Sequence, residues 1–324
     1  MKMDIYKKIY LIVIAIAAIV LVAACTETAD SQDIGEQEQR FFDLYMASNY
    51  PDVQPQSTGI YLLEHKAGTG STPDSADWLL VNHVCYTIPE DIIYESYVEN
   101  VAIDNRFYES IAMYGPYKMQ NGSRNEGLTE GLLLMSEGAQ ATIFFTSDLG
   151  FGTTGSGGIT PYQSLKYEIE LLEVIKDIDA YELDRINTYM DTILVADTIQ
   201  DPVSDAIMYV IIDEATDGAP VVNDSLVQIA YKGYLMDGRV FDQRTAADPF
   251  EITVGKDVIA GWDLGLLLLH EGEKARFVIP YQLAYGEAGS GDPASGVRVI
   301  PPFETLLFDI EIISIEANPD AEDE

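Results

Sequence analysis

The stretch of sequence that decides the fold occurs twice in this chain. It first reads Gly127-Leu128-Thr129-Glu130-Gly131-Leu132-Leu133-Leu134, and 134 residues later it returns as Gly261-Trp262-Asp263-Leu264-Gly265-Leu266-Leu267-Leu268. Self-similarity at a long and constant spacing indicates a duplicated structural unit. The sequence therefore predicts two domains of one fold, and a short helix from Val258 to Leu268 in the second of them.

Further matching pairs extend the repeat toward the C-terminus. The same spacing relates Glu137-Gly138 to Glu271-Gly272, and Phe151-Gly152 to Tyr285-Gly286. Beyond that point the spacing becomes 141 residues, which relates Ile159-Thr160-Pro161 to Ile300-Pro301-Pro302, and Tyr167-Glu168-Ile169-Glu170 to Phe308-Asp309-Ile310-Glu311. One gap between two runs of constant spacing is typical of a loop insertion. We therefore expect seven extra residues in the second copy, after Tyr285-Gly286.

Strand patterns dominate the second copy. Segments 226–231, 276–279 and 306–313 are rich in β-branched and aromatic residues, and Met236-Asp237-Gly238-Arg239 has the Asp-Gly pair of a hairpin turn. Many strands with one short helix favour an α+β fold. In each copy we predict an antiparallel β-sheet curled around the short helix.

Each copy follows a stretch with helical periodicity. Residues 36–49 place Phe41, Leu44, Tyr45 and Ser48 on one face, and residues 177–194 do the same with Leu183, Ile186, Met190 and Ile193. We predict two linker helices that pack on the domains that follow them. The alternative is that these stretches are mobile tethers.

The N-terminus has the pattern of an export signal. Lys2, Lys7 and Lys8 precede an uncharged apolar run from residue 9 to residue 24, which ends in Val22-Ala23-Ala24-Cys25. This ending resembles a bacterial lipobox, in which the signal peptide is cut before the cysteine and the thiol of Cys25 is acylated. Such lipidation predicts a membrane anchor in the cell envelope. By resemblance to known sorting, Thr26 favours the outer membrane, on either its periplasmic or its surface face. The alternative is an uncleaved N-terminal anchor.

These patterns divide the chain into six segments. We expect a lipoprotein signal peptide, a lipid tether with a helix, a first domain, a linker helix, a second domain and an acidic tail. Their predicted ranges are 1–24, 25–56, 57–176, 177–202, 203–317 and 318–324.

Composition restricts the possible partners. The chain has 324 residues, 47% of them hydrophobic, which excludes collagen-like and mainly disordered classes. With 54 acidic and 18 basic residues its formal charge is −36, so it repels phosphates and we expect no nucleic acid partner. Two cysteines and three scattered histidines favour neither a disulfide scaffold nor a zinc site, and no calcium-binding loop is present, so we expect no cofactor. Cys85, in a strand-like run, is expected to be a buried apolar residue.

The second copy has no recognisable nucleophile motif or phosphate loop, but it has an ordered set of aromatic and aliphatic residues. They occur in Tyr231, Phe241-Asp242, Pro249-Phe250, Val258-Ile259, Gly261-Trp262, Ala284-Tyr285-Gly286, Ile300-Pro301-Pro302 and Phe308. In this order the fragments resemble the FKBP-type (immunophilin) peptidyl-prolyl cis-trans isomerases over residues 203–316. The resemblance implies two FKBP-like domains and an isomerase of Xaa-Pro bonds.

The resemblance also implies the role of each residue. Trp262 would form the pocket floor, and the Ile259 backbone N–H would hold a substrate carbonyl. Asp242 would order the pocket, and the Tyr285 hydroxyl would donate a hydrogen bond to the ligand. The expected site residues are Tyr231, Phe241, Asp242, Phe250, Val258, Ile259, Trp262, Tyr285, Ile300 and Phe308. The flap arginine that often pairs with the pocket aspartate has only Arg244 as a candidate here.

The first copy departs from this pattern. The sequence aligns Tyr86, Tyr94, Tyr117 and Tyr167 with Tyr231, Phe241, Phe250 and Phe308. Glu95 replaces Asp242, Leu128 replaces Trp262, Phe151 replaces Tyr285, and Asn125-Glu126 lies near the missing Val-Ile pair. We expect an apolar pocket with Glu126 at its lip that binds proline poorly, so the first domain is predicted to be structural or protein-binding.

The implied partners are proline-containing unfolded or exported polypeptides, with macrolides as possible inhibitors. Rotation about an Xaa-Pro bond requires a catalyst only to bind the twisted amide better than the planar forms. The absence of a nucleophile therefore agrees with the implied activity. Two alternatives are a proline-peptide-binding module without turnover and a chaperone that holds unfolded chains.

Overall fold

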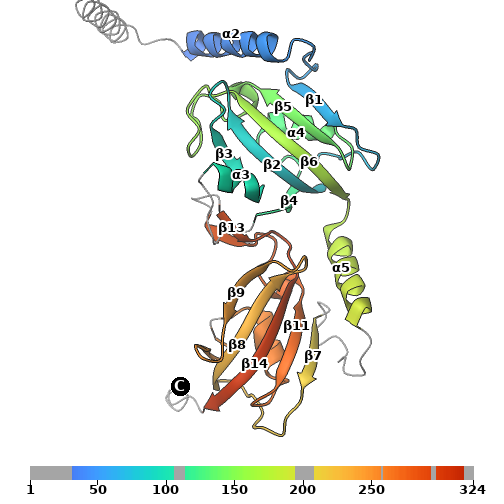
Figure 1. Cartoon of the computed structure of the whole chain (residues 1–324), viewed down its shortest axis with the longest axis vertical. Coiled ribbons are helices and arrows are strands. Elements are labelled where there is room, and N and C mark those ends of the chain that lie inside the picture. The colour runs from blue at the N-terminus through green and yellow to red at the C-terminus, as the bar shows by residue number, and fades with distance from the viewer. Residues whose placement is uncertain (1–30, 106–113, 194–207, 257, 293–296, 317–324) are drawn as a thin grey trace, which may run out of the picture.

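The chain forms two bodies of the same architecture, one above the other in Figure 1. The computed structural model describes residues 31–105, 114–193, 208–256, 258–292 and 297–316. Each body is a six-stranded antiparallel sheet with a short helix against it. We call the body of strands β1–β6 the first domain and the body of strands β7–β14 the second domain.

The sheet of the first domain has the strand order β1-β5-β6-β2-β3, and β4 also pairs with β2. The preceding helix is α2 (Ser31–Asn49). The elements of this domain are β1 (Tyr61–Lys66), β2 (Trp78–Thr87), β3 (Ile93–Ser96), α3 (Glu99–Asp104), β4 (Tyr117–Gln120), α4 (Glu126–Leu133), β5 (Gln140–Phe145), η1 (Ser147–Leu149) and β6 (Leu165–Ile175).

The sheet of the second domain has the strand order β7-β11-β14-β8-β10, and β9 also pairs with β8. Strands β7, β11, β14 and β8 thus correspond to β1, β5, β6 and β2. The preceding helix is α5 (Ile178–Ile193). The elements are β7 (Tyr209–Glu214), β8 (Leu226–Leu235), β9 (Val240–Arg244), β10 (Phe250–Thr253), α6 (Ala260–Leu266), β11 (Lys274–Ile279), η2 (Tyr281–Leu283), β12 (Ser290–Asp292), β13 (Val297–Ile300) and β14 (Leu306–Glu316).

The predicted α+β fold with two antiparallel sheets is confirmed. The strand segments and the hairpin turn coincide with β8, β11, β14 and the β8–β9 connection. The insertion after Tyr285-Gly286 includes β12 and β13, which pair as a separate two-stranded sheet. Helix α3 was not predicted from the sequence, because no partner in the second copy marks it.

Two glycines set the distance between each short helix and its sheet. A Cβ atom on Gly261 would lie 2.4 Å from the Ile279 side chain, and one on Gly265 would lie 2.5 Å from Phe277. In α4, Gly127 and Gly131 approach Phe145 and Ile143 as closely. Only glycine permits such contacts, so the spacing of the quoted repeat is the spacing at which a helix can lie directly on large sheet side chains.

Both linker helices pack on the domain that follows them, as predicted. Phe42 and Met46 of α2 are buried against Ile88 and Phe144. Burying each of these side chains stabilises the fold by roughly 1.5–3 kcal/mol. The predicted face of α2 was wrong, however. Phe41 is 68% exposed and Leu44 is 64% exposed, because the helix turns its Phe42–Met46 edge to the sheet.

Helix α5 uses the corresponding face. Ile186 and Met190 are buried against Ile211, Val278 and Leu307 of the second domain, with Ile193 packed beside them. Leu183, which was predicted on this face, is 37% exposed. The i, i+4 spacing of Ile186 and Met190 therefore carries the contact.

The two domains meet at a buried charged contact, which we call the domain joint. Lys118 of β4 lies 2.8 Å from a Glu182 carboxylate oxygen on α5 and 2.6 Å from one of Glu304 in the second domain. Its ammonium group also donates to the Phe303 carbonyl at 2.9 Å. Arg185 pairs with both glutamates, so two cations face two carboxylates. Burial raises the Glu304 pKa, but Lys118 and Arg185 outweigh it and hold that pKa below its ordinary value.

Aromatic rings complete the domain joint. Trp78 of β2 meets Phe303 edge to face, with ring centroids 4.6 Å apart, and Tyr281 packs on Phe303 at 4.9 Å. Arg239 of the second domain donates a hydrogen bond to the Tyr114 carbonyl of the first. The two domains are therefore held by specific packing as well as by α5.

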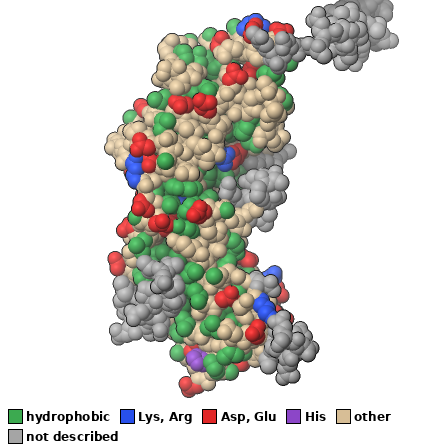
Figure 2. Space-filling model, turned by 180° about the vertical axis from the view of Figure 1, so that it is seen from behind, with side chains coloured by type: hydrophobic (Ala, Val, Ile, Leu, Met, Phe, Trp, Pro, Cys, Tyr) green, Lys and Arg blue, Asp and Glu red, His purple; other side chains and the backbone are tan. Residues whose placement is uncertain are grey.

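Acidic side chains are scattered over both domains on the face seen in Figure 2, with fewer basic ones between them. This agrees with the formal charge of −36 and with an acidic surface that repels anionic polymers. Over the residues that the structure describes, no helix is both long and apolar enough to cross a membrane. The expected signal peptide, Cys25 and the acidic tail lie outside the described residues.

Replacing Lys118 by methionine tests the domain joint. The substitution leaves Glu182 and Glu304 buried with Arg185 as their remaining cation. We expect the free energy of unfolding to fall by about 3–5 kcal/mol, because the two buried carboxylates then share one cation and one negative charge is left uncompensated. Urea titration followed by circular dichroism measures this loss, and small-angle X-ray scattering measures the accompanying separation of the domains.

Lys256→Met is the matched control, because it removes a lysine from an exposed pair with Asp224. Exposed ion pairs contribute little, so its effect should be much smaller and the domain separation should stay unchanged. Equal losses from the two substitutions would contradict a structural role for the buried cluster.

Candidate functional site

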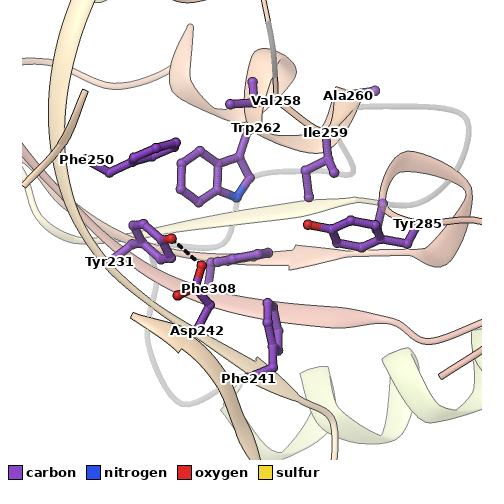
Figure 3. Close-up of a pocket in the computed structure, with 11 residues that line it drawn as sticks. Tyr231, Phe241, Asp242, Phe250, Val258, Ile259, Ala260, Trp262, Tyr285 and Phe308 are labelled. Carbon is purple, nitrogen blue, oxygen red and sulfur yellow. Dashed lines mark hydrogen bonds between the residues drawn. The ribbon is translucent and has the colours of Figure 1, made fainter. Parts of the chain in front are cut away.

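A cavity of about 530 Å³ opens in the second domain between α6 and the sheet (Figure 3). Strands β8, β9, β10 and β14 supply one side of it, and α6 with its preceding turn supplies the other. Its lining residues are Tyr231, Phe241, Asp242, Phe250, Val258, Ile259, Ala260, Trp262, Ala284, Tyr285 and Phe308.

Trp262 forms the floor of this cavity. Its ring is 4% exposed, with its centroid 5.0 Å from that of Tyr231 and 5.2 Å from that of Phe308, both edge to face. Phe241 meets Phe308 in the same manner at 5.5 Å. Aromatic edges and faces therefore surround an apolar space. Among the described residues, the buried indole N–H of Trp262 has no hydrogen-bond partner.

A single carboxylate enters the aromatic wall. The Tyr231 hydroxyl donates a hydrogen bond to Asp242 at 2.5 Å, shown dashed in Figure 3. The other Asp242 oxygen accepts from the Gln243 backbone N–H at 2.8 Å. Burial and then this hydrogen bond raise the Tyr231 pKa, so the hydroxyl remains a protonated donor. Arg244 instead pairs with Asp248 at 3.2 Å, and Asp242 is held by Tyr231.

The rim of the cavity comes from two turns. Ile259 is the N-cap residue of α6, and its carbonyl accepts the Trp262 backbone N–H at 2.9 Å. Tyr285 is 40% exposed, and its hydroxyl points across the cavity in Figure 3. Burial and the nearby Asp242 charge raise the Tyr285 pKa, so this hydroxyl also remains able to donate.

The structure brings the expected site residues together with one exception. Ile300 is 2% exposed and belongs to the hydrophobic core of the domain, not to the cavity lining. Ala260 and Ala284 line the cavity and were not expected. Both are adjacent to expected residues, and their small side chains leave space at the mouth; sequence adjacency was the only signal that could have found them.

Strand register corrects the comparison between the two domains. Tyr231 lies opposite Ile310 on β14, and the equivalent Ile169 on β6 lies opposite His83. His83 is therefore the counterpart of Tyr231, and the expectation that Tyr86 takes this position was wrong. The constant spacing between the two copies does not extend to this strand, so the sequence alone does not distinguish His83 from Tyr86 as the residue opposite Ile169.

A buried ionic cluster fills the corresponding space in the first domain. The Arg124 guanidinium donates two hydrogen bonds to the Glu95 carboxylate, at 2.6 and 2.9 Å, and His83 Nε2 lies 3.3 Å from a Glu95 carboxylate oxygen. Asn125, the N-cap of α4, donates to the Tyr167 hydroxyl at 3.2 Å. The expected apolar pocket with Glu126 at its lip is thus corrected, since Glu126 is exposed and Arg124 lies inside.

The pKa values agree with a closed ionic cluster. Burial lowers the His83 pKa and outweighs the effect of Glu95, so the ring is neutral at pH 7. Burial raises the Glu95 pKa, but His83 and Arg124 outweigh it and hold that pKa well below its ordinary value. Burial also raises the pKa of the Cys85 thiol to about 12. Cys85 therefore stays protonated, and it is fully buried as the sequence indicated.

Comparison with known proteins gives a consistent match. The sequence model of a family described as FKBP-type peptidyl-prolyl cis-trans isomerase matches residues 89–172 and 218–313. The FKBP-type peptidyl-prolyl cis-trans isomerase FkpA of Escherichia coli (strain K12) is 37% identical over 120 residues, covering 37% of this chain and 41% of that protein. FK506-binding protein 2 of Yarrowia lipolytica is 41% identical over 99 residues, covering 30% of this chain and 65% of that protein. The matches thus span less than two thirds of these relatives.

Two solved structures of FKBP domains also align with parts of this chain. FkpA from Escherichia coli aligns with a TM-score of 0.36 and 30% identity, covering 44% of this chain and 64% of that one. The three FKBP domains of wheat FKBP73 align with a TM-score of 0.33 and 20% identity, covering 82% of this chain and 99% of that one.

Gly233 leaves room for two aromatic rings of the cavity wall, and substituting it tests this. It lies opposite Phe308 and Asp242 in the sheet, where the first domain has Cys85. A Cβ atom there would lie 2.6 Å from the Phe241 ring and 2.9 Å from Phe308. We expect Gly233→Cys to destabilise the second domain by about 1–3 kcal/mol through overpacking.

Urea titration and near-ultraviolet circular dichroism of the aromatic rings measure this change. The reverse substitution in the first domain, Cys85→Gly, is the matched control and should leave the aromatic cavity unaltered. An unchanged unfolding midpoint and aromatic spectrum in Gly233→Cys would show that the cavity does not depend on this glycine.

Proposed function

The chain belongs to the FKBP-type peptidyl-prolyl cis-trans isomerase family, and from this premise we propose that its second domain catalyses rotation about Xaa-Pro bonds. The observation that carries the proposal is the aromatic cavity over Trp262, with Asp242 and Tyr285 at its edge. The first domain, in this proposal, has no catalytic part.

Catalysis of this rotation requires only that the protein bind the twisted amide more tightly than the planar forms. The barrier to rotation is about 18–20 kcal/mol, because rotation breaks the amide resonance. The twisted amide has less charge separation between nitrogen and oxygen than the planar forms, so a dry aromatic space favours it. A proline ring on Trp262 would bring its preceding carbonyl between the walls formed by Tyr231, Phe241 and Phe308.

The polar groups would then orient the substrate. Ile259 and Tyr285 both line the cavity and lie near each other in Figure 3, so the Tyr285 hydroxyl and the Ile259 backbone N–H could hold substrate carbonyls. Asp242 is fixed by Tyr231, so its charge lies at a defined position beside the reacting carbonyl. Phe250 and Val258 close the remaining apolar wall.

The ionic cluster supports a non-catalytic first domain. Arg124 occupies the position of Val258, and His83 and Glu95 occupy those of Tyr231 and Asp242. Inserting a proline ring would require these charged groups to separate or lose their partners, which costs several kcal/mol.

Assistance to the folding of exported proteins is the biological role we propose, from a position anchored in the envelope through lipidated Cys25. The lipobox-like sequence and the acidic surface support this location. Holding unfolded chains is a second candidate, favoured by three exposed leucines on α6 and in the turn directly after it. Leu264, Leu267 and Leu268 are 39%, 38% and 40% exposed. A holdase would suppress aggregation even after the cavity is altered.

Paired substitutions test the assignment of activity to one domain. The full chain should accelerate cis-to-trans isomerisation of an Ala-Leu-Pro-Phe peptide. We expect Trp262→Leu and Phe241→Leu to lower kcat/KM by about tenfold or more, or about 1.4 kcal/mol, because each removes part of the apolar surface around the twisted amide. Circular dichroism verifies that each variant is folded.

Tyr94→Leu is the matched control, since Tyr94 is the first-domain counterpart of Phe241, and it should retain full activity. A macrolide should inhibit the wild-type chain through the second domain. Full activity in folded Trp262→Leu would refute the assignment to this cavity. No acceleration by the folded wild-type chain would leave a docking or holding function.

Cys25→Ser tests the anchor independently. Without a thiol at residue 25, lipid attachment cannot occur, and we expect the chain to move from the membrane fraction to the soluble fraction. Metabolic labelling with a radioactive fatty acid, followed by fractionation, measures both changes. Ser31→Ala, a serine-site control outside the lipobox, should stay labelled and membrane-bound. Unaltered membrane retention of Cys25→Ser would instead indicate an uncleaved anchor.

A further inference from the structure

The structural repeat includes the linker helix as well as the domain that follows it. Phe42 and Met46 of α2 are buried as Ile186 and Met190 of α5 are, at one common spacing along the chain. The same spacing relates Glu38 to Glu182. The chain therefore consists of two equivalent units, each a helix docked on an FKBP-like domain.

A glutamate fixes each helix at the same place. Glu38 accepts hydrogen bonds from the Ser164 hydroxyl at 2.7 Å and from the Ser147 backbone N–H at 2.7 Å. Glu182 accepts from the hydroxyl of Thr305, the counterpart of Ser164, at 3.0 Å. The two helices thus present the same side to the loop before the last strand.

The neighbouring loop residue has the same unusual backbone in both units. Tyr162 has φ of 58° and Phe303 has φ of 52°, in the left-handed region that few non-glycine residues adopt. Their N–H groups donate to Gly152 and Gly286 carbonyls at 3.0 and 3.1 Å. Each unit therefore builds an equivalent surface from its linker helix, this loop and a turn. The turn follows β2 in the first unit and β8 in the second.

In the second unit this surface is the domain joint. Glu182 and Arg185 of the helix, Phe303 and Glu304 of the loop, and the turn at residues 236–239 receive the first domain. The incoming edge offers a lysine, Lys118 on β4, next to an aromatic ring on β2.

In the first unit the equivalent surface is a groove of about 320 Å³. Phe41 takes the position of Arg185, Gln163 that of Glu304, and Tyr162 that of Phe303. The groove is lined by Glu38, Phe41, Phe42, Ile88, Pro89, Glu90, Tyr162, Gln163 and Ser164. Phe41 is 68% exposed in it, so an apolar ring that a docked edge would cover faces solvent.

We propose that this groove binds the strand edge of another folded protein, one that presents a lysine beside an aromatic ring as Lys118 and Trp78 do. Charge supports this occupant, because the groove contains Glu38 and Glu90 and no basic side chain lines it within the described residues. The aromatic ring of the partner would cover Phe41 and Tyr162. The proposal does not depend on isomerase activity.

Within the part of the chain that the structure describes, such an edge occurs once. Lys118 is already used in the domain joint. In the second domain, Glu251 and Leu226 stand on β10 and β8 where the first has Lys118 and Trp78. A carboxylate at this position would face Glu38 and be repelled. Residues 25–30, which precede α2, carry Glu27 and Asp30 and no basic residue.

A variant that gives the second domain the missing edge tests the groove. The full chain with Leu226→Trp and Glu251→Lys should assemble head to tail, with the edge of one molecule in the groove of the next, because a heterologous contact builds a ring or an open chain of molecules. Within one molecule, the two sides of the domain joint meet at an effective concentration on the order of millimolar. The same contact between separate molecules lacks this advantage, so the protein is studied at concentrations up to that range. Sedimentation velocity in a mild detergent measures the mean mass.

We expect the wild-type chain to remain monomeric and the edge variant to grow with concentration. Adding Glu38→Gln to the edge variant should raise the concentration needed for assembly about tenfold or more. Adding Glu36→Gln, on an exposed position of the same helix, should have no effect.

A variant with a redesigned groove shows whether a failure to assemble comes from the introduced edge or from the native groove. Adding Phe41→Arg and Gln163→Glu to the edge variant reproduces Arg185 and Glu304 of the domain joint. Assembly of this variant without assembly of the simple edge variant would overturn the proposal, since the native groove would then lack the required chemistry. Failure of both, or self-association of the wild-type chain through the groove, would overturn it as well.

Discussion

The contact of a glycine-bearing helix with its sheet is the constraint on which this structure depends. Gly261 and Gly265 let α6 lie directly on Ile279 and Phe277. At that distance the side chain of Trp262, between the two glycines, meets the Tyr231 and Phe308 rings edge to face and forms the floor of the cavity. A larger residue at either glycine would lift the helix and open the aromatic contacts, so the position of the cavity follows from a packing distance.

The same backbone carries opposite chemistry in the two domains. A tyrosine–aspartate hydrogen bond in the second domain, from Tyr231 to Asp242, corresponds to a His83–Glu95–Arg124 cluster in the first. An aromatic cavity tolerates one carboxylate because a neutral hydroxyl holds it. The first domain instead neutralises its glutamate with a guanidinium, and that guanidinium occupies the space. Fold identity thus says little about which domain can bind a proline ring.

Treating the linker helix as part of the repeat changes how the chain is understood. Lys118 joins two units whose mating surfaces are equivalent, and only one of these surfaces is filled within the chain. The predicted packing of both helices was correct, but the predicted face of α2 was not. Phe41 and Leu44 satisfy helical periodicity as well as Phe42 and Met46 do, and periodicity alone cannot say which stripe meets a sheet.

The sequence by itself determined the duplication and the strands β8, β11 and β14, and its resemblance to a known family gave nearly all of the cavity residues, because short motifs in a constant order carry that information along the chain. Only the tertiary structure decided that His83 rather than Tyr86 faces Glu95, that Ile300 lies in the core, and that Lys118 meets Glu304. Strand register and contacts between distant segments arise from the pairing of whole elements. The tertiary structure fixes them, because a shift of one residue in the pairing would turn the buried face of a whole strand to solvent.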